Sequence, residues 1–295
     1  MALEDQLASW TGPSSETEKN KQERTERMIR EAVRAHAGFA GCDISVYTKG
    51  SYANNTNVKA DSDVDVAVQC NEVRYWGEAE KGAHPPADSY HGIWTPKKLR
   101  SELQQALENK FPGQVDSAGS TAFRINSNTA RVDADVVPCF DYRYYFSNTN
   151  YRDGSKVFKK DGSPLINYPV QQLANGKSKN GRTRQYYKKA VRIMKRVENA
   201  MAIKGDHREV PSFFVECLVY NCPDKIFLAP TWTETVRRAI YHIWEGLDGA
   251  EPEVESERWL EVSECKYLFH SGQAWNPGDG RDFAKAAWNY LGLSS

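Results

Sequence analysis

Alternating apolar and polar residues predict a strand-rich first half of the chain. Successive side chains of a strand point to opposite faces, so an alternating segment is expected to bury one of them. Four segments have this pattern: residues 43–49, 63–69, 121–126 and 130–137. Pro138 is predicted to end the last strand, because proline donates no ladder hydrogen bond. The Asp161-Gly162 pair within residues 156–168 predicts a hairpin.

Apolar residues spaced three to four positions apart predict helices, most of them in the second half. The predicted helices cover residues 14–38, 97–111, 182–201, 211–221, 231–247 and 281–291. Ser15 and Glu18 have the spacing of a capping box at the start of the first helix. Early strands and late helices are typical of an α+β protein. We therefore predict two lobes: residues 1–168, with the long N-terminal helix and the sheet, and residues 169–295, which are helical.

Composition and charge exclude several classes of protein. The 295 residues carry 39 basic and 39 acidic side chains, so the formal net charge is zero. A protein that grips long nucleic acid usually has a basic excess, and we expect no such partner. There is no run of about 18 apolar residues, and the acidic N-terminal segment does not resemble a signal peptide. Six scattered cysteines without a C-x-x-C pair indicate free thiols. These observations predict a cytoplasmic protein without membrane contact.

Three aspartates, Asp61, Asp63 and Asp65, stand at the start of the second predicted strand, where aspartate is unusual. Asp63 and Asp65 project from one face, with carboxyl groups roughly 5–7 Å apart. Two unpaired anions there are unfavourable, and a hard cation such as Mg²⁺ would remove the repulsion. Asp133 and Asp135 repeat the arrangement on the fourth strand. If both strands face the same way, the carboxylates meet as a two-metal phosphoryl-transfer site requires.

The Gly50-Ser51 turn before this strand favours a phosphate site. A turn of small residues lets backbone N–H groups approach phosphate oxygens, and the Ser51 hydroxyl adds a donor. An Asp-x-Asp pair without such a turn is common, and its aspartates are often only turn residues. The Gly50-Ser51 turn together with the Asp63-x-Asp65 pair therefore indicates a metal and phosphate site more strongly than either feature alone.

The order Gly50-Ser51, then Asp63-Val64-Asp65-Val66, resembles the signature of the DNA-polymerase-β-like nucleotidyltransferase superfamily. The resemblance implies a two-lobed fold in which a mixed sheet with helices is joined to a helical C-terminal lobe. It also implies a third carboxylate on a later strand. Asp135 in the segment 135-DVVP-138 matches that position best, and Asp133 is the alternative. Lys49 departs from the pattern, which often has an apolar residue there.

Further segments resemble one branch of the superfamily, the bacterial CD-NTases, relatives of cyclic GMP-AMP synthase and oligoadenylate synthetase. In chain order they are GSYANNTNVKADSDVDV, ADVVPCF, VRIMK, PSFFVECLVYN and KYLFH. By this resemblance, residues 1–168 are the catalytic lobe and residues 169–295 bind nucleotide. The enzyme would join ribonucleoside triphosphates into a cyclic di- or trinucleotide second messenger for anti-phage defence, releasing pyrophosphate. We expect a monomer that signals to a downstream effector through its product.

The resemblance also assigns roles to the acidic residues. Asp63, Asp65 and Asp135 are the expected catalytic residues and the ligands of two Mg²⁺ ions, or of Mn²⁺ in their place. Asp135 would lie closest to the attacking hydroxyl and could take its proton. Gly50 and Ser51 would bind the triphosphate.

The predicted helix at 182–201 has a basic face formed by Arg184, Lys188, Arg192 and Lys195. Such a face is often only solvated, but a bound triphosphate needs countercharge. The resemblance implies that Lys195 reaches the triphosphate, and Lys188 is also expected to bind substrate. It further implies that Ser212 hydrogen-bonds the phosphates and that Phe213 stacks on a base. Ser212 could also cap its helix, and Phe213 could belong to the core.

Two other functions remain open from the sequence. One is a nucleotidyltransferase that modifies RNA ends or protein side chains without cyclising, although the neutral charge speaks against RNA. The other is an inactive binding module on the same fold, against which the three intact acidic positions argue.

Overall fold

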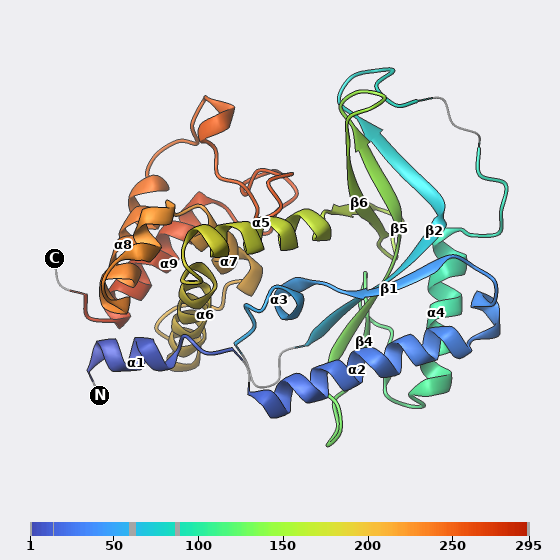
Figure 1. The fold of residues 1–295 in the computed structure, drawn as a ribbon, viewed down its shortest axis with the longest axis horizontal. Coiled ribbons are helices and arrows are strands. Elements are labelled where there is room, and N and C mark those ends of the chain that lie inside the picture. Colours follow the sequence, from blue (N-terminus) through green and yellow to red (C-terminus); the bar gives the residue numbers. More distant parts are fainter. Residues whose placement is uncertain (1, 14, 59–62, 86–88, 294–295) are drawn as a thin grey trace. The chain divides into compact units, whose positions relative to one another are not determined.

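The structure, a computed structural model, describes residues 2–13, 15–58, 63–85 and 89–293 (Figure 1). Asp61 lies outside the described residues. The helices are α1 (Leu3–Ser9), α2 (Glu16–Ala35), α3 (Gly50–Ala53), α4 (Pro96–Lys110), α5 (Pro169–Arg182), α6 (Tyr187–Lys204), α7 (Ser212–Tyr220), α8 (Trp232–Gly246) and α9 (Pro277–Tyr290). The strands are β1 (Ile44–Thr48), β2 (Val64–Glu78), β3 (Val115–Asp116), β4 (Phe123–Ile125), β5 (Ala134–Tyr145), β6 (Tyr151–Phe158) and β7 (Pro164–Asn167).

The described strands form one mixed sheet, in the order β1-β2-β5-β4-β3, with β6 pairing with β5 and β7. The central pair, β2 and β5, is parallel, and the other pairs are antiparallel. In the central pair Val64 lies opposite Ala134, and Asp65 lies opposite Asp135. This register brings the two Asp-x-Asp segments side by side at the start of both strands.

Helices α2 and α4 cover one face of the sheet, where alternate strand residues are apolar. Val64, Val66 and Val136 pack there with Ile29 of α2 and Leu103 of α4 in one buried cluster. Because strand side chains alternate, the intervening residues of β2 and β5 point to the opposite face. The carboxylates of Asp65 and Asp135 therefore lie on the face away from the two helices.

The chain divides into two compact units. The sheet unit comprises residues Ser14–Ala53 and Lys59–Val170. The helical unit comprises Met1–Pro13, Asn54–Val58 and Gln171–Ser295, with a core built on α6, α7, α8 and α9. Sequence analysis placed all of residues 1–168 in one lobe, whereas two short segments of that range group with the helices. Among the described residues, no helix combines the length and apolar character needed to cross a membrane.

The predicted α+β fold with a mixed sheet and a helical C-terminal region is confirmed. The prediction that Pro138 ends its strand is wrong, because β5 continues to Tyr145. Pro138 pairs with Val68 on one side, while on the other side β4 stops opposite Val136 and β6 starts opposite Phe140. The missing N–H thus falls where no second strand is paired, as at a sheet edge.

The predicted helix at 182–201 is in fact the C-terminal end of α5, a turn, and α6. Arg184 and Gln185 have φ angles of 52° and 68°, a left-handed conformation that breaks the helix. α6 begins at Tyr187, so Arg184 does not belong to the basic face expected on that helix. The remaining predicted helices are present, and Ser15 caps α2 by accepting from the Glu18 N–H at 3.2 Å.

Candidate active site

Asp63, Asp65 and Asp135 lie together in the sheet unit at the start of the central strands. Asp65 and Asp135 are direct neighbours across the parallel β2–β5 pair. Neighbouring strands are about 4.8 Å apart, so these two carboxylates share one small region of the sheet face. Asp63 stands two residues before Asp65, and its carboxylate lies 3.4 Å from Arg124, the residue opposite Asp135 on β4.

Two of these carboxylates, Asp63 and Asp135, have raised pKa values. Burial raises the pKa of Asp63, against the opposing effect of Arg124, and the charges of Asp135 and the other aspartates add to the rise. Burial and then the charge of Asp65 raise the pKa of Asp135. Desolvation and like-charge repulsion both disfavour the ionised form. A cation placed between the carboxylates would relieve both effects.

Asp133 differs from Asp135 because the protein already satisfies its carboxylate. Its oxygens accept hydrogen bonds from the Ser127 N–H and from Arg124, the latter at 2.9 Å. Burial works to raise the pKa of Asp133, but the hydrogen bonds from Arg124 and Ser127 outweigh it and hold the pKa below its usual value. Asp133 is therefore a less suitable metal ligand than Asp135, which lies in β5 opposite Asp65.

Gly50 is required by the close approach of its turn to Asp65. The residue has a φ of +70°, and a Cβ at this position would collide with the Asp65 carboxylate. The neighbouring Lys49 donates its backbone N–H to the Asp65 carbonyl at 2.9 Å, and its ammonium lies 3.4 Å from the Asp65 carboxylate. Ser51 follows as the second residue of α3 and is partly exposed. The turn and the aspartate are thus packed as one structure.

The donor set suits a hard divalent cation. Three carboxylates on one face, two of them with raised pKa values, offer the oxygen ligands that Mg²⁺ prefers. Within the described ranges, no group of three or more acidic, histidine or cysteine side chains is arranged so that it could hold a metal ion by itself. Mg²⁺ commonly completes its coordination with water and substrate phosphates, so an incomplete protein cage is compatible with this ion.

The other expected site residues lie in the helical unit. Lys188 is half-buried on α6, and burial lowers its pKa while the charge of Glu216 opposes that change. Ser212 is exposed as the first residue of α7, and Pro211 stands at the N-cap position. Phe213 is partly buried against the helical core, where its ring lies 6.3 Å from that of Trp275. The binding roles of these three residues stay predictions.

Lys195 is buried and does not present its ammonium to solvent. The Nζ atom lies 2.6 Å from a carboxylate oxygen of Glu216 and 3.4 Å from the Thr56 hydroxyl. Arg192, expected on the same basic face, donates to the backbone carbonyl oxygens of Thr11 and Asn55. Two of the three basic residues on the α6 face are therefore bonded to protein groups in this structure.

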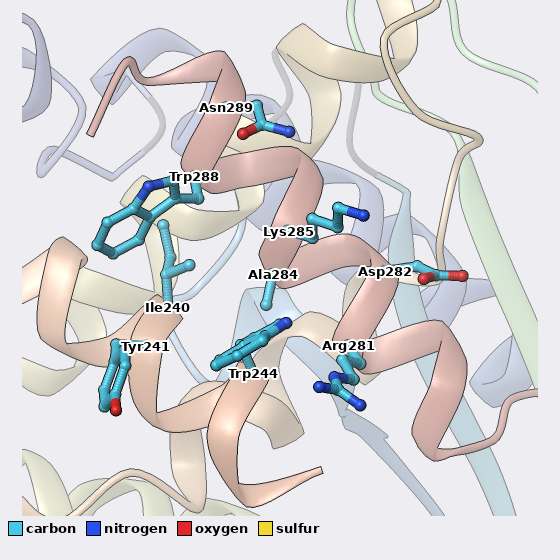
Figure 2. Close-up of a pocket in the computed structure, with 9 residues that line it drawn as sticks. All are labelled: Ile240, Tyr241, Trp244, Arg281, Asp282, Ala284, Lys285, Trp288 and Asn289. Carbon is cyan, nitrogen blue, oxygen red and sulfur yellow. The ribbon is translucent and has the colours of Figure 1, made fainter. Parts of the chain in front are cut away.

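Two cavities among the described residues lie away from most of the expected site residues. A cavity of about 290 Å³ in the sheet unit is lined by residues of α2 and of the loop before β5, including Asp133. Figure 2 shows a larger one, about 600 Å³, between α8 and α9 of the helical unit, with Trp244, Trp288 and Arg281 in its wall. None of the expected site residues lines either cavity except Asp133, the alternative third carboxylate.

Known proteins are similar to this chain over nearly its full length. Residues 26–115 match a nucleotidyltransferase domain, and residues 174–292 match the cGAS/DncV-like nucleotidyltransferase C-terminal helical domain. A cyclic dipyrimidine nucleotide synthase CdnE of Legionella pneumophila is 38% identical over 98% of this chain and 97% of its own length. The chain belongs to the CD-NTase family. The predictions of the family and of a nucleotidyltransferase enzyme are confirmed.

Solved CD-NTase structures agree with the fold. The CdnE cyclic dinucleotide synthase of Elizabethkingia meningoseptica, solved with GTP and Apcpp, has a TM-score of 0.82 and 31% identity, covering 98% of this chain and 99% of that one. The CdnE c-UMP-AMP synthase of Rhodothermus marinus, solved with Apcpp and Upnpp, has a TM-score of 0.83 and 26% identity, covering 99% and 97%. Both relatives are nucleotide-bound synthases.

Two residues of this CD-NTase site were not identified from the sequence. Arg124 of β4 lies opposite Asp135 and reaches Asp63 at 3.4 Å as well as Asp133. Lys49 was noted only as a departure from the superfamily pattern, yet it pairs with Asp65. The alternation of apolar and polar residues over 121–126 could have indicated on which face of the sheet Arg124 lies. The residues that Arg124 contacts, however, depend on the register between β4 and β5.

Proposed function

We propose that the protein is a divalent-metal-dependent synthase that joins two ribonucleoside triphosphates into a cyclic dinucleotide. The observation that carries the proposal is the pairing of Asp65 with Asp135 on one face, beside Asp63 and the Gly50 turn. Raised pKa values at Asp63 and Asp135 mark an anionic site that a cation would stabilise. Membership of the CD-NTase family and 38% identity to a cyclic dipyrimidine nucleotide synthase support the same reaction.

In each step, a ribose hydroxyl of one nucleotide attacks the α-phosphorus of another. A new P–O bond forms, the bond from the α-phosphorus to the β-phosphate bridging oxygen breaks, and pyrophosphate leaves. Asp63, Asp65 and Asp135 would hold two Mg²⁺ ions, which supply charge stabilisation for the attacking and leaving oxygens. Asp135, which the family resemblance places closest to the attacking hydroxyl, would accept its proton. A second such step between the joined nucleotides closes the ring.

Several side chains and backbone groups are proposed to bind the triphosphates. The Ser51 hydroxyl and the N–H groups of its turn would donate to phosphate oxygens. Exposed Ser212 and half-buried Lys188 would add a donor and a charge, and Phe213 would offer a partly exposed ring to a base. The burial of Lys195 supports an indirect role for that residue, which is developed below.

The base composition of the product is proposed to include a pyrimidine. The relatives with 38% and 26% identity are named as a cyclic dipyrimidine synthase and a c-UMP-AMP synthase. We place the product in anti-phage signalling, where a separate effector would read it, on the basis of family membership.

The test is incubation with all four ribonucleotides and Mg²⁺, followed by mass spectrometry after phosphatase treatment. A phosphatase-resistant cyclic dinucleotide formed without added acceptor is the expected result. Asp63→Asn combined with Asp65→Asn should lower pyrophosphate release by about 10³-fold or more, since several kcal/mol of charge stabilisation are lost. Asp206→Asn, at an exposed position of the helical unit, is the matched control. Undiminished pyrophosphate release from the double variant would contradict the assignment, and linear or acceptor-linked products would indicate a non-cyclising transferase.

A further inference from the structure

The segment Asn54–Val58 belongs to the helical unit, although the residues on both sides of it belong to the sheet unit. Upstream are Gly50 and Ser51, the proposed phosphate-binding turn. Downstream are Asp63 and Asp65, the proposed metal ligands. The chain therefore leaves the sheet unit between the two halves of the proposed site and then returns. Whatever holds this segment acts on the connection between those halves.

A buried polar cluster in the helical unit holds the segment by its side chains. The Glu216 carboxylate accepts from the Asn54 amide at 2.8 Å, from the Thr56 hydroxyl at 2.7 Å and from the Lys195 ammonium at 2.6 Å. The exposed fractions of Asn54, Thr56, Lys195 and Glu216 are 0, 0, 2 and 1%. The Glu216 carboxylate is thus bound by one ammonium and two neutral donors.

The residue between the two anchored side chains is fixed by its backbone. Asn55 has a φ of 54°, which is uncommon for a residue other than glycine. Its carbonyl oxygen accepts from the guanidinium of Arg192 at 2.6 Å. Three successive residues are therefore held in one turn by side chains of α6 and α7.

The packing around this turn leaves little freedom. Gly176 of α5 faces the Asn54 side chain, and a Cβ at Gly176 would lie 2.9 Å from the Asn54 amide oxygen. Asn54 is therefore pressed between the backbone of α5 and the Glu216 carboxylate. We name the set Asn54, Asn55, Thr56, Arg192, Lys195 and Glu216 the turn clamp.

The composition of the turn clamp argues for a role beyond stability. A buried ion pair is at best a weak source of stability, because desolvation of both charges offsets their attraction. Apolar residues could fill the same volume, but they would not define hydrogen-bond positions for the turn. A buried carboxylate with three donors instead specifies one conformation of the chain segment that it binds.

We propose that the turn clamp positions the Gly50-Ser51 turn relative to the Asp63–Asp65 strand for catalysis. The proposal rests on the proposed function, because it assigns the two ends of the segment to phosphate and metal binding. Lys195 then acts through Glu216 and Thr56 and does not touch the triphosphate. It is a positioning residue, as are Arg192 and Glu216.

The test compares Thr56→Val with Thr56→Ser and with Thr235→Val. Valine is nearly isosteric with threonine but releases Glu216 from one donor, whereas serine keeps the hydroxyl. Thr235 is a second buried threonine of the helical unit, and its hydroxyl donates to the Thr231 carbonyl outside the turn clamp. It provides the same chemical change without contact to the segment.

Steady-state pyrophosphate release at saturating Mg²⁺ gives kcat and KM, and thermal melts give the folded fraction. Thr56→Val should lower kcat about 10- to 100-fold, the scale of a small misplacement of reacting groups, while KM changes less than about threefold. Thr56→Ser should recover most of kcat, and Thr235→Val should retain it. Hydrogen exchange of peptides covering residues 50–66 should accelerate in Thr56→Val and not in Thr235→Val.

Three outcomes would overturn the proposal. An unchanged kcat in folded Thr56→Val would show that the turn clamp is only structural. A raised KM with unchanged kcat would show that this region binds nucleotide directly. An equal loss of kcat in Thr235→Val would attribute the effect to general destabilisation. If the wild-type protein releases no pyrophosphate, the proposed function itself fails. That result is distinct from failure of the turn-clamp proposal alone, in which the wild-type protein is active.

Discussion

Two cations stand beside the aspartates of the proposed site. The Lys49 ammonium lies 3.4 Å from the Asp65 carboxylate, and Arg124 contacts Asp63 and Asp133. The Asp-x-Asp pairs were recognisable in the sequence because the first of them follows the Gly50-Ser51 turn and the second repeats it on another predicted strand. The neighbouring cations were not, because a lone Lys or Arg is ordinary and only strand register shows what it meets.

Replacing Lys49 should strengthen metal binding. Lys49→Met removes a positive charge that competes with a metal ion for Asp65, while Lys49→Arg keeps that charge. An exposed or half-exposed ion pair contributes about 0.2–1 kcal/mol, so the Kd for Mn²⁺ should fall by about 1.5- to 5-fold in Lys49→Met. Electron paramagnetic resonance of free Mn²⁺ measures this without turnover. Weaker Mn²⁺ binding in Lys49→Met would show instead that Lys49 orients the carboxylate.

At the scale of elements, α2 supports the strand that carries Asp135. The Thr25 hydroxyl of α2 accepts from the Val132 N–H at 3.2 Å and donates to the Lys21 carbonyl at 2.8 Å. Period and capping were enough to predict α2, because its apolar stripe and Ser15 are local signals. The helix break at Arg184 was not predictable, because a left-handed turn without glycine depends on tertiary structure. The continuation of β5 through Pro138 was not predictable either, because it depends on which strands pair beside that residue.

Thr25→Val should destabilise the sheet unit. The buried Val132 N–H would lose its acceptor, which costs about 1–3 kcal/mol of unfolding free energy. Thr25→Ser keeps the hydroxyl and should lose less. Urea denaturation followed by circular dichroism measures both variants. Equal stability of Thr25→Val and wild type would mean that another group satisfies Val132.

At the scale of the whole molecule, each of the two compact units contains segments that are separated in the sequence. The helical half was predictable because, after about residue 169, the alternating pattern of strands gives way to apolar residues at helical spacing. The assignment of Asn54–Val58 to the helical unit was not predictable. It depends on Glu216, which lies more than a hundred residues away and had been read only as part of a helix.

The pH dependence of global stability should reveal the unneutralised carboxylates. The pKa values of Asp63 and Asp135 are higher in the folded chain than in the unfolded chain, with burial as the first cause. The folded state therefore binds protons more tightly, and its stability falls as pH rises through the folded pKa values. Asp135→Asn removes one such group, so without metal it should be more stable than wild type at neutral pH.

This difference should vanish below about pH 3, where the unfolded carboxyl, with an ordinary pKa near 3.9, is also protonated. Urea denaturation in EDTA at a series of pH values measures it. Added Mg²⁺ should stabilise wild type more than Asp135→Asn, because binding to the folded state raises its stability. A variant less stable than wild type at neutral pH would show that Asp135 is already neutralised by the protein.

The collision that a Cβ at Gly50 would make with Asp65 also limits how this enzyme can evolve. Every single-nucleotide change of a glycine codon that replaces the residue introduces a Cβ atom, whichever amino acid results. No point mutation of the Gly50 codon itself can therefore adjust the turn in small steps. A lineage under selection to reduce a harmful activity could silence the enzyme at this position, but graded attenuation would have to arise elsewhere in the gene.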